Sequence, residues 1–248
     1  MADAVPAPLP PGSTLGILGG GQLGRMLSQA ASRLGFNVVI LDPEENSPAG
    51  RVSQGQIVAA YDNPTALSVL GQTCQAVTFE FENVPAVSVE RLVEGGAVVA
   101  PGPKALAVAQ DRVEEKTFLN SVGAPTVAFT AIETLEDLRH AVDRLGVPVL
   151  LKTRREGYDG KGQVWIKSPA DVARAWKTIG GRPAILEARA SFQRELSVIC
   201  ARGRDGAVAV YPLGENVHKG GVLKTTVAPA KVDEKTQARA HAIAAAIL

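Results

Sequence analysis

The chain of 248 residues is 46% hydrophobic and 21% charged, which is typical of a globular protein and leaves room for one large domain or two smaller ones. The net charge is only +1, from 26 basic and 25 acidic residues, so the charge balance indicates neither nucleic-acid binding nor a membrane-binding surface. No apolar run approaches the ~20 residues of a membrane span, and the two cysteines, Cys74 and Cys200, lie in no metal-ligand or disulfide pattern, which fits a reducing, cytoplasmic setting.

The first half of the chain alternates strand-like and helix-like segments. Residues 1–12 contain four prolines and no lysine or arginine, and are expected to form a short disordered leader. The alternation that follows, up to the Pro101–Pro103 run, predicts a doubly wound α/β domain with a parallel sheet over residues 13–103. The expected strands are 14–18, 37–42, 56–59, 76–79 and 97–100, and the expected helices include 22–34 and one that starts at Pro64 after the N-cap Asn63.

The second half, residues 104–248, has a different order of elements and predicts an α+β domain. A helix is expected over 104–121, and a capping box that begins at Thr134 predicts a helix running to Leu145. Ser168 and Pro169 are the expected N-cap and first residue of another helix. The expected strands are 147–152, 164–167 and 184–187, an antiparallel hairpin is expected for 195–201 with 207–211, and a last helix is expected from about Glu234 to the end of the chain.

The stretch GILGGGQLGRM places Gly19, Gly21 and Gly24 in the spacing G-x-G-x-x-G between the first strand and the first helix. With Asp42 at the end of the second strand, the pattern matches a dinucleotide-binding turn in which an acidic residue holds a ribose hydroxyl. The free N–H groups at a helix N-terminus bind any phosphate or carboxylate, so a ribose-phosphate substrate suits the turn equally well. The spacing alone leaves both interpretations open.

A second glycine-rich stretch, GYDGKGQ, follows the strand that ends at Lys152. Gly157, Gly160 and Gly162 surround Lys161, and such glycines let backbone N–H groups approach phosphate oxygens while lysines neutralise them. The P-loop pattern is absent from this stretch. A flexible hairpin tip with solvated lysines is the alternative.

Isolated acidic residues and one histidine are weaker candidates. Glu187 ends a strand and Glu195 follows it, and either can be a surface group. Glu80 and Glu82 alternate in a strand-like way, so one of them can reach the carboxyl edge of the sheet. His218 is one of three histidines, and a lone histidine is more often structural than catalytic.

Together these stretches resemble the ATP-grasp enzymes, and most closely the N5-carboxyaminoimidazole ribonucleotide synthetases of purine biosynthesis. The motifs that carry the resemblance occur in family order between Gly16 and Pro229: GILGGGQLGRM, LDPEENSPA, TFEFENVP, PGPKAL, AQDRVEEK, LLKTRREGYDGKGQ, LEARASFQRELSV and YPLGENVHKGGVL. The resemblance implies a pre-ATP-grasp domain over 13–103 and an incomplete ATP-grasp domain over 104–248, with a lid subdomain at about 125–190. It also implies a carbon–nitrogen ligase that forms a homodimer when full length.

The resemblance assigns roles to the matching residues. Phosphate contacts fall to Arg112 and Lys152, the lid loop to 157–163, the adenine site to 187–190, the ribose to Glu195, and a place near the transferred phosphate to His218. The implied ATP set is Arg112, Lys152, Gly157, Tyr158, Asp159, Gly160, Lys161, Gly162, Gln163, Glu187, Ala188, Arg189, Ala190, Glu195 and His218. The implied ribonucleotide set is Gly21, Gln22, Leu23, Glu80, Tyr158 and Lys161, and the implied catalytic residues are His218, Lys152 and Lys161.

The implied reaction converts ATP and bicarbonate to carboxyphosphate and ADP, and transfers the carboxyl group, as CO2, to the exocyclic amine of aminoimidazole ribonucleotide. Such chemistry requires charge neutralisation, near in-line geometry and exclusion of water more than a covalent nucleophile. Mg²⁺ is the implied metal cofactor. Its ligands are expected in the C-terminal part of the family, so no metal ligand is assigned in this chain.

Two features depart from the family pattern. Glu156 stands where the family has a small residue before GYDG, and this extra anion either weakens the loop's attraction for phosphate or faces solvent. The chain also ends within a helix, before the family's paired magnesium ligands, so it is expected to be a fragment with little activity alone.

Three alternatives stay open at this point. The first is another ATP-grasp ligase, such as a formate-dependent glycinamide ribonucleotide transformylase. The second is an NAD-dependent dehydrogenase built on the glycine turn and Asp42. The third is a non-catalytic nucleotide-binding chain.

Overall fold

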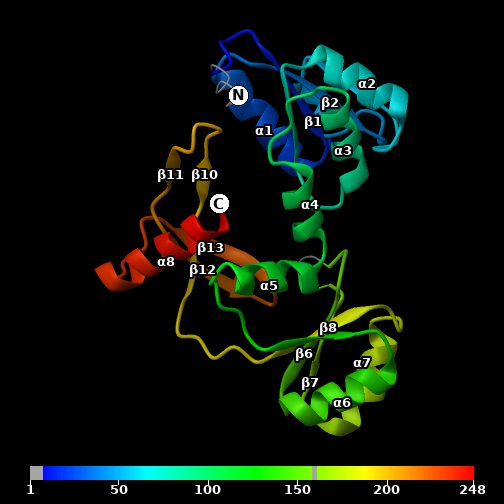
Figure 1. Cartoon of the computed structure of the whole chain (residues 1–248), viewed down its shortest axis with the longest axis vertical. Coiled ribbons are helices and arrows are strands. Elements are labelled where there is room, and N and C mark those ends of the chain that lie inside the picture. The colour runs from blue at the N-terminus through cyan, green and yellow to red at the C-terminus, as the bar shows by residue number, and fades with distance from the viewer. Residues whose placement is uncertain (1–7, 158–160) are drawn as a thin grey trace. The chain divides into compact units, whose positions relative to one another are not determined.

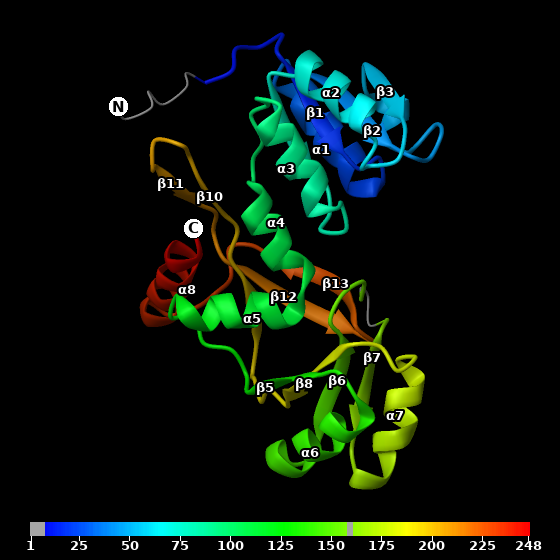
Figure 2. The ribbon, with the colours of Figure 1, turned by 45° about the vertical axis from the view of Figure 1, so that its right-hand side comes forward.

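The computed structural model describes residues 8–157 and 161–248 and divides the chain into two compact units (Figures 1 and 2). The N-terminal unit ends at Gln110, and Asp111 begins the C-terminal unit. Within the described ranges, none of the helices has the length and apolar content that a bilayer crossing requires.

The N-terminal unit is a parallel sheet with helices on both faces, which confirms the predicted doubly wound arrangement. Its strands lie in the order β3-β2-β1-β4, and adjacent residues of each strand face opposite sides. Ile17 and Ile40 pack toward α1, whereas Leu18 and Leu41 pack toward α2 and α3. The elements are β1 (Thr14–Leu18), α1 (Gln22–Arg33), β2 (Asn37–Asp42), a 3-10 turn (Gly50–Val52), β3 (Gly55–Val58), α2 (Pro64–Thr73), β4 (Ala76–Phe79), α3 (Ala86–Glu94) and α4 (Pro103–Gln110).

The segment 97–100, expected as a fifth strand, makes only a single parallel bridge between Val99 and Val77. Val77 N–H donates to Val98 C=O at 2.8 Å, and Ala100 N–H donates to Val77 C=O at 3.0 Å. The pairing ends there because the next residue, Pro101, has no N–H to donate.

The helix expected over 104–121 is two helices, α4 and α5 (Arg112–Ser121), which meet at Asp111. Asp111 has extended backbone angles, and its side chain accepts hydrogen bonds from Val113 N and Glu114 N, so it is the N-cap of α5. Helix α4 belongs to the N-terminal unit, because Leu106 packs in the core of that unit and Gln110 donates to Val84 C=O. The units therefore divide at residue 110, whereas the sequence places the boundary at 103.

The first part of the C-terminal unit is an antiparallel sheet, β5-β8-β6-β7, with α6 and α7 on one face (Figures 1 and 2). Val149, Leu151 and Leu186 pack against these two helices in a core of buried residues. The Thr134 capping box at the start of α6 is confirmed. The elements are β5 (Phe129–Ile132), α6 (Leu135–Leu145), β6 (Val149–Thr153), β7 (Gln163–Ile166), a 3-10 turn (Pro169–Asp171), α7 (Val172–Thr178) and β8 (Ala184–Ala188).

The rest of the unit departs from the expected hairpin of 195–201 with 207–211. Only β10 (Cys200–Arg202) and β11 (Val208–Val210) pair with each other, whereas β9 (Glu195–Ser197) pairs with β12 (Gly214–Lys219). The apolar alternation of this segment predicts a strand, but it cannot specify a partner that lies further along the chain. Strand β12 also pairs with β13 (Val222–Val227), and α8 (Glu234–Ile247) follows with Asp233 as its N-cap.

The third glycine of the turn, Gly24, gives a test of the packing of α1 on the sheet. A Cβ atom at this position would lie 2.6 Å from the carbonyl oxygen of Gly19 and 2.9 Å from Glu80 Oε2. We therefore expect Gly24→Ala to lower the free energy of unfolding by about 1–3 kcal/mol, measured by urea denaturation followed by circular dichroism.

Gly102→Ala is the matched control, because no atom lies within 4 Å of a Cβ built at Gly102. It should change the stability by less than about 0.5 kcal/mol. Equal stability of the Gly24→Ala variant and the parent chain would show that the turn has room for a side chain.

Candidate functional site

The glycine turn before α1 is filled by carboxylates of the protein itself. Gly20 N–H donates to Asp42 Oδ2 at 2.7 Å, Gly21 N–H donates to Glu80 Oε1 at 2.7 Å, and Gly24 N–H donates to Glu80 Oε2. Glu80 thus takes the place of an anion at the N-terminus of α1, where the helix dipole favours negative charge. Gln22 and Leu23 in the first helical turn are exposed beside it, so Gly21, Gln22, Leu23 and Glu80 come together as expected.

Asp42 has a structural role in this turn. It is 7% exposed and also accepts hydrogen bonds from Tyr61 Oη at 2.6 Å and Glu44 N at 2.7 Å. Burial and this hydrogen bond to Asp42 raise the pKa of Tyr61, so its hydroxyl stays a donor. A carboxylate engaged with three donors is poorly suited to hold a ribose hydroxyl, which removes the main support for the dinucleotide interpretation.

The sheet of the C-terminal unit presents a second group of polar residues on the face opposite α6 and α7, here called the site face. Leu150 is opposite both Trp165 and Glu187 in the strand register, and Lys152 lies two residues further along β6. Side chains two residues apart in a strand share a face. Lys152, Trp165 and Glu187 therefore lie on the site face, and the residues between them form the core.

Glu187 is the most buried charged group of the site face, with 6% of the residue exposed. Lys152 Nζ donates to Glu187 Oε2 at 2.8 Å, and Lys116 Nζ, from α5, lies 3.6 Å from Glu187 Oε1. The sequence assigned Lys152 and Glu187 to the site but not Lys116. Its motif, AQDRVEEK, contained the lysine, and the α-helical spacing from Arg112 to Lys116 was the available signal.

A cavity of about 520 Å³ lies over the site face. Its apolar lining comes from Val127, Leu150, Trp165 and Phe192, with both aromatic side chains partly or largely exposed. Lys152, Glu187 and the segment 188–191 complete the lining, so the predicted stretch Glu187–Ala190 lies here. An apolar cavity of this size with a few charged groups and exposed aromatic rings suits a flat heteroaromatic ligand. Trp165 and Phe192 were missed from the sequence.

Arg112 holds the start of the glycine-rich loop. Its guanidinium donates to Thr153 C=O at 3.0 Å and to Gly157 C=O at 2.5 Å. Thr153 N–H donates to Gly162 C=O at 2.8 Å, so the described ends of the loop are joined at its base. Lys161 and Gln163 are exposed, and the predicted residues Tyr158, Asp159 and Gly160 lie outside the described residues.

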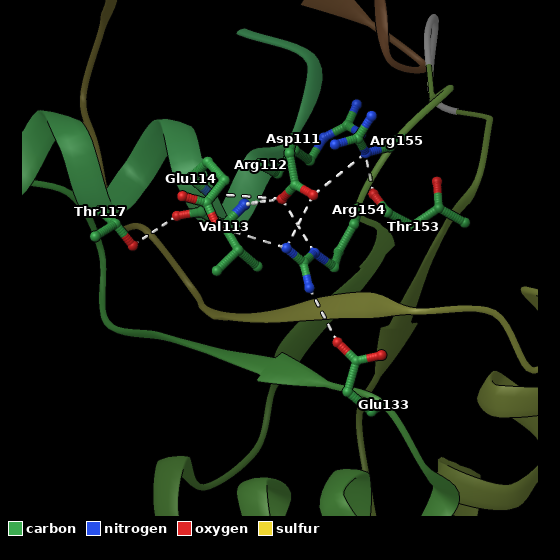
Figure 3. A network of polar contacts seen from close by, with 9 residues as sticks. All are labelled: Asp111, Arg112, Val113, Glu114, Thr117, Glu133, Thr153, Arg154 and Arg155. Carbon is green, nitrogen blue, oxygen red and sulfur yellow. Dashed lines mark hydrogen bonds and ion pairs between the residues drawn. The ribbon is translucent and has the colours of Figure 1, made fainter. Parts of the chain in front are cut away.

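A network around Asp111 connects α5 to the end of β6 (Figure 3). Asp111 is 3% exposed, and it accepts from Arg154 Nε at 3.0 Å while Arg154 Nη2 lies 2.9 Å from its other oxygen. Arg154 Nη1 also donates to Glu133 at 3.0 Å, and Arg155 Nε lies 3.4 Å from Asp111. The sequence pattern predicts Asp111 within a helix. Its spacing of three residues before Glu114 is a capping signal that could have identified it.

The hydrogen bonds of this network determine the ionisation of Asp111. Burial alone would raise the pKa of its carboxyl group, but the hydrogen bond from Arg154 and those from Val113 N and Glu114 N outweigh burial and lower the pKa. Asp111 therefore stays ionised at neutral pH, and α5 remains attached to the residues that precede the loop.

Glu195 and His218 form a pair in the sheet of β9, β12 and β13. His218 Nδ1 lies 2.9 Å from Glu195 Oε2, and both side chains are partly exposed. This contact engages one ring nitrogen of His218 and leaves Nε2 for another partner. Nearby, Arg194 makes two hydrogen bonds to Glu215, at 2.8 and 2.5 Å, which link β9 to β12.

Glu156, which departs from the family pattern, has a left-handed backbone conformation with φ of 62°. Glycine adopts this region without the steric cost that a Cβ atom brings, which explains why a small residue suits the position. The Glu156 carboxylate lies 3.8 Å from Arg182, and both side chains are more than half exposed, so the pair adds little stability.

Residues 8–157 and 161–248 contain no group of three or more His, Cys, Asp or Glu side chains arranged to hold a metal ion such as Mg²⁺. Two carboxylates of the site, Glu80 and Asp42, are occupied by backbone N–H groups, and Glu187 is paired with lysines.

Two family models match the chain. The ribonucleotide synthetase preATP-grasp domain matches residues 13–110, and the ATP-grasp domain matches residues 117–248. The first match ends at the residue where the N-terminal unit ends.

Several proteins of one activity resemble this chain. An N5-carboxyaminoimidazole ribonucleotide synthase of Brucella melitensis biotype 1 is 47% identical over 242 residues, which are 97% of this chain and 67% of that protein. The solved structure of N5-carboxyaminoimidazole synthetase from Staphylococcus aureus complexed with ADP has a TM-score of 0.89 and 38% identity, over 96% of this chain and 64% of that one. The Aspergillus clavatus synthase in complex with ADP and 5-aminoimidazole ribonucleotide has a TM-score of 0.84 and 29% identity, over 96% and 62%. The chain thus spans about two thirds of the length of these relatives.

Replacement of Glu156 by glycine should stabilise the C-terminal unit. Because glycine relieves the left-handed strain but is more flexible in the unfolded chain, we expect Glu156→Gly to raise the free energy of unfolding by about 0.5–1 kcal/mol. The measurement is urea unfolding followed by fluorescence of Trp165 and Trp176, which both lie in this unit. Asn46, with φ of 57°, is the matched position in the N-terminal unit, and Asn46→Gly, followed by circular dichroism because both tryptophans lie in the other unit, should gain less because asparagine tolerates this region. A loss of stability in Glu156→Gly would contradict the strain.

The Asp111 network should make stability depend on pH. The pKa of Asp111 is lowered by folding, so its contribution is present above the ordinary aspartate range and is lost as the pH falls through the lowered value. Asp111→Asn keeps a capping oxygen but loses the charge that holds Arg154. We expect it to cost about 1–3 kcal/mol at neutral pH, by urea unfolding, and progressively less as the pH falls below the ordinary aspartate range. Glu133→Gln, at a more exposed partner of Arg154, should cost less than about 1 kcal/mol. A pH-independent cost for Asp111→Asn would show that its charge is not responsible.

Proposed function

The chain belongs to the N5-carboxyaminoimidazole ribonucleotide synthase family, within the ATP-grasp enzymes, and we propose that it carries the nucleotide-binding and ribonucleotide-binding parts of an ATP-dependent carboxylase. The reaction proposed is the formation of carboxyphosphate from ATP and bicarbonate, followed by transfer of its carboxyl group to the exocyclic amine of aminoimidazole ribonucleotide. The observation that carries the proposal is the site face, where Lys152 and Glu187 lie at an apolar cavity with two exposed aromatic rings.

In the C-terminal unit, the proposed ligand of the cavity is the adenosine part of ATP. Trp165 and Phe192 offer aromatic surfaces to the base, and the main chain of Glu187–Ala190 at the cavity offers the hydrogen-bonding groups that read the edge of a purine. The relatives solved with ADP support this choice of ligand.

Lys152 is the proposed phosphate ligand of this unit, because its ammonium group lies at the cavity on the site face. Phosphoryl transfer depends on positioning and on neutralising the charge of the transferred group, and lysines supply both. A phosphate contact of Arg112 stays a prediction. Its guanidinium donates to the carbonyl groups of Thr153 and Gly157, and we propose that it anchors the base of the loop while its remaining N–H groups strengthen the positive field there.

Glu195 and His218 are proposed to act as a pair on the ribose and the transferred phosphate. While Glu195 engages Nδ1 of His218, Nε2 can donate to or accept from a substrate oxygen. Lys161 is proposed to act from the glycine-rich loop. The contribution of this loop is to exclude water from carboxyphosphate, which hydrolyses readily.

In the N-terminal unit, we propose that aminoimidazole ribonucleotide binds at the first turn of α1. Gln22 and Leu23 are exposed in the first turn of the helix. The Glu80 carboxylate accepts hydrogen bonds from the N–H groups of Gly21 and Gly24 in the same turn. Because Glu80 already satisfies the N–H groups of Gly21 and Gly24, the turn has no anion vacancy of the kind that a pyrophosphate needs. Glu80 can instead accept a hydrogen bond from a hydroxyl or amine of the ribonucleotide, and the Aspergillus clavatus relative has been solved with this ribonucleotide bound.

Mg²⁺, a homodimer and a cytoplasmic setting stay predictions for this chain. An NAD-dependent dehydrogenase loses its main support with the structural role of Asp42. A ligase that uses glycinamide ribonucleotide and formate differs only in its amine and acid, so substitution of these two substrates in the same assay separates it from the carboxylase.

Nucleotide binding is tested with the fluorescence of Trp165, one of two tryptophans in the chain. In a Trp176→Phe background, ADP should change the fluorescence of Trp165 saturably, because the base lies against the indole ring. Lys152→Met should weaken ADP binding about tenfold or more, with adenosine binding nearly unchanged. Lys177→Met, an exposed lysine on α7, is the matched control and should bind as the parent does.

The absence of any saturable ADP response would contradict the nucleotide site. Carboxylase activity is measured separately, as phosphate release that requires ATP, bicarbonate and aminoimidazole ribonucleotide together. It is compared for this chain and for this chain joined to the C-terminal third of the Brucella melitensis relative. ADP binding without such phosphate release in either protein would favour the non-catalytic alternative.

A further inference from the structure

The carboxylate of Glu187 is shared by two lysines from different elements. Lys152 on β6 donates to Oε2 at 2.8 Å, and Lys116 on α5 lies 3.6 Å from Oε1. The Glu187 side chain is 8% exposed, and Oε1 has no hydrogen-bond partner in the described part of the chain. At 3.6 Å the Lys116 contact is an ion pair that is longer than a hydrogen bond.

The two lysines differ in their access to the cavity. Among the described residues, Lys152 is part of the cavity lining and Lys116 is not, and their side chains are 24% and 17% exposed. Arg112 and Glu115 are the other charged groups of α5 close to this cluster, and the pKa of Glu115 is raised by burial against the opposing effect of Lys116 and Arg112. The cluster around Glu187 thus contains three cations, Lys116, Lys152 and Arg112, and two carboxylates, Glu187 and Glu115.

Binding of a phosphate by Lys152 creates a conflict. When Lys152 also donates to a phosphate oxygen with another of its three N–H groups, its positive charge is shared between two anions, and its interaction with Glu187 weakens. A buried carboxylate that loses its only cation bears a large desolvation penalty. With Lys152 as its sole partner, Glu187 would compete with the phosphate for the same ammonium group.

We propose that Lys116 is a positioning residue of the nucleotide site, which keeps Glu187 paired while Lys152 turns to a phosphate of the bound nucleotide. This inference rests on the proposed nucleotide site and adds to it a residue that acts through Glu187. Lys116 moves from 3.6 Å into hydrogen-bond distance of the unpartnered Oε1, and Glu187 changes cations without ever being unpaired. The phosphate then gains Lys152 at little cost in desolvation of the carboxylate.

The contribution of Lys116 to binding should be confined to ligands that carry a phosphate. Adenosine has no group that requires Lys152 to leave Glu187, so its affinity should not depend on Lys116. ADP does require this change. Removal of the negative charge of Glu187 should also remove the need for Lys116, which distinguishes an action through Glu187 from a direct contact with the phosphate.

The experiment compares dissociation constants of ADP and adenosine by isothermal titration calorimetry for the full 248-residue chain and four variants. We expect Lys116→Met to weaken ADP binding about tenfold and to change adenosine binding less than about twofold. Lys116→Arg, which keeps the cation, should bind ADP as the parent does. Glu187→Gln in the Lys116→Met background should restore ADP binding to within about threefold of the parent. Lys177→Met is the control for loss of a lysine elsewhere in the unit.

Each other outcome overturns the inference in a recognisable way. Unchanged ADP binding in Lys116→Met shows that Glu187 does not compete for Lys152. An equal loss of ADP and adenosine binding shows a general distortion of the cavity. Loss of ADP binding that Glu187→Gln fails to restore shows that Lys116 contacts the phosphate itself. A parent chain that binds neither ligand overturns the nucleotide site and this inference together, whereas the first three outcomes leave the nucleotide site intact.

Discussion

The alternation of side chains along strand β6 is the constraint on which the site of the C-terminal unit depends. Because neighbouring residues of a strand point to opposite faces, Leu151 and Thr153 are committed to the side of α6 and α7, and Lys152 is committed to the site face. The strand ends at Thr153, and the next residue, Arg154, turns to Asp111 at the start of α5. Lys152, Thr153 and Arg154 thus supply a cation at the cavity, a buried residue at the end of the strand and an ion pair to the start of α5.

Strand β8 brings the counter-charge to the same place. Its register sets Glu187 opposite Leu150, on the face of Lys152, while Ala184 and Leu186 pack in the core beneath α6 and α7. Helix α5 then contributes Arg112 at the base of the loop and Lys116 at Glu187, one helical turn apart. Because the Asp111 cap determines where α5 starts, it also determines which of the helix residues reach the site. Helix α5 therefore links the two clusters, because Asp111 is its N-cap and Lys116, on the same helix, contacts Glu187.

The N-terminal unit shows how one backbone turn can serve different chemistry. A glycine turn at a helix N-terminus attracts an anion, and here the anion is part of the chain, because Glu80 and Asp42 occupy the N–H groups. The G-x-G-x-x-G spacing predicts the turn correctly in either case. Whether the turn receives a pyrophosphate depends on Glu80, which directly follows β4 and lies 59 positions from Gly21 in sequence.

Local patterns in the sequence determined most elements of both units. The strands 14–18, 37–42 and 76–79 have the predicted bounds, and the helix caps at Asn63 and Thr134 are confirmed, because these signals depend on residues within one turn or one strand. Motif order was enough to identify the family. It also predicted Lys152 and Glu187 as site residues; the structure places the two on one face of the sheet and in contact, and their role stays a prediction.

Only the tertiary structure decided the contacts between elements. The sequence predicted one helix over 104–121, because helical periodicity continues across Asp111, and only the long-range bonds to Arg154 make that residue a cap. The partner of β9, the occupation of the glycine turn and the approach of Lys116 to Glu187 likewise join residues far apart in the chain. Local periodicity carries no information about such distant partners, since it reports which face a side chain takes and not what that face meets.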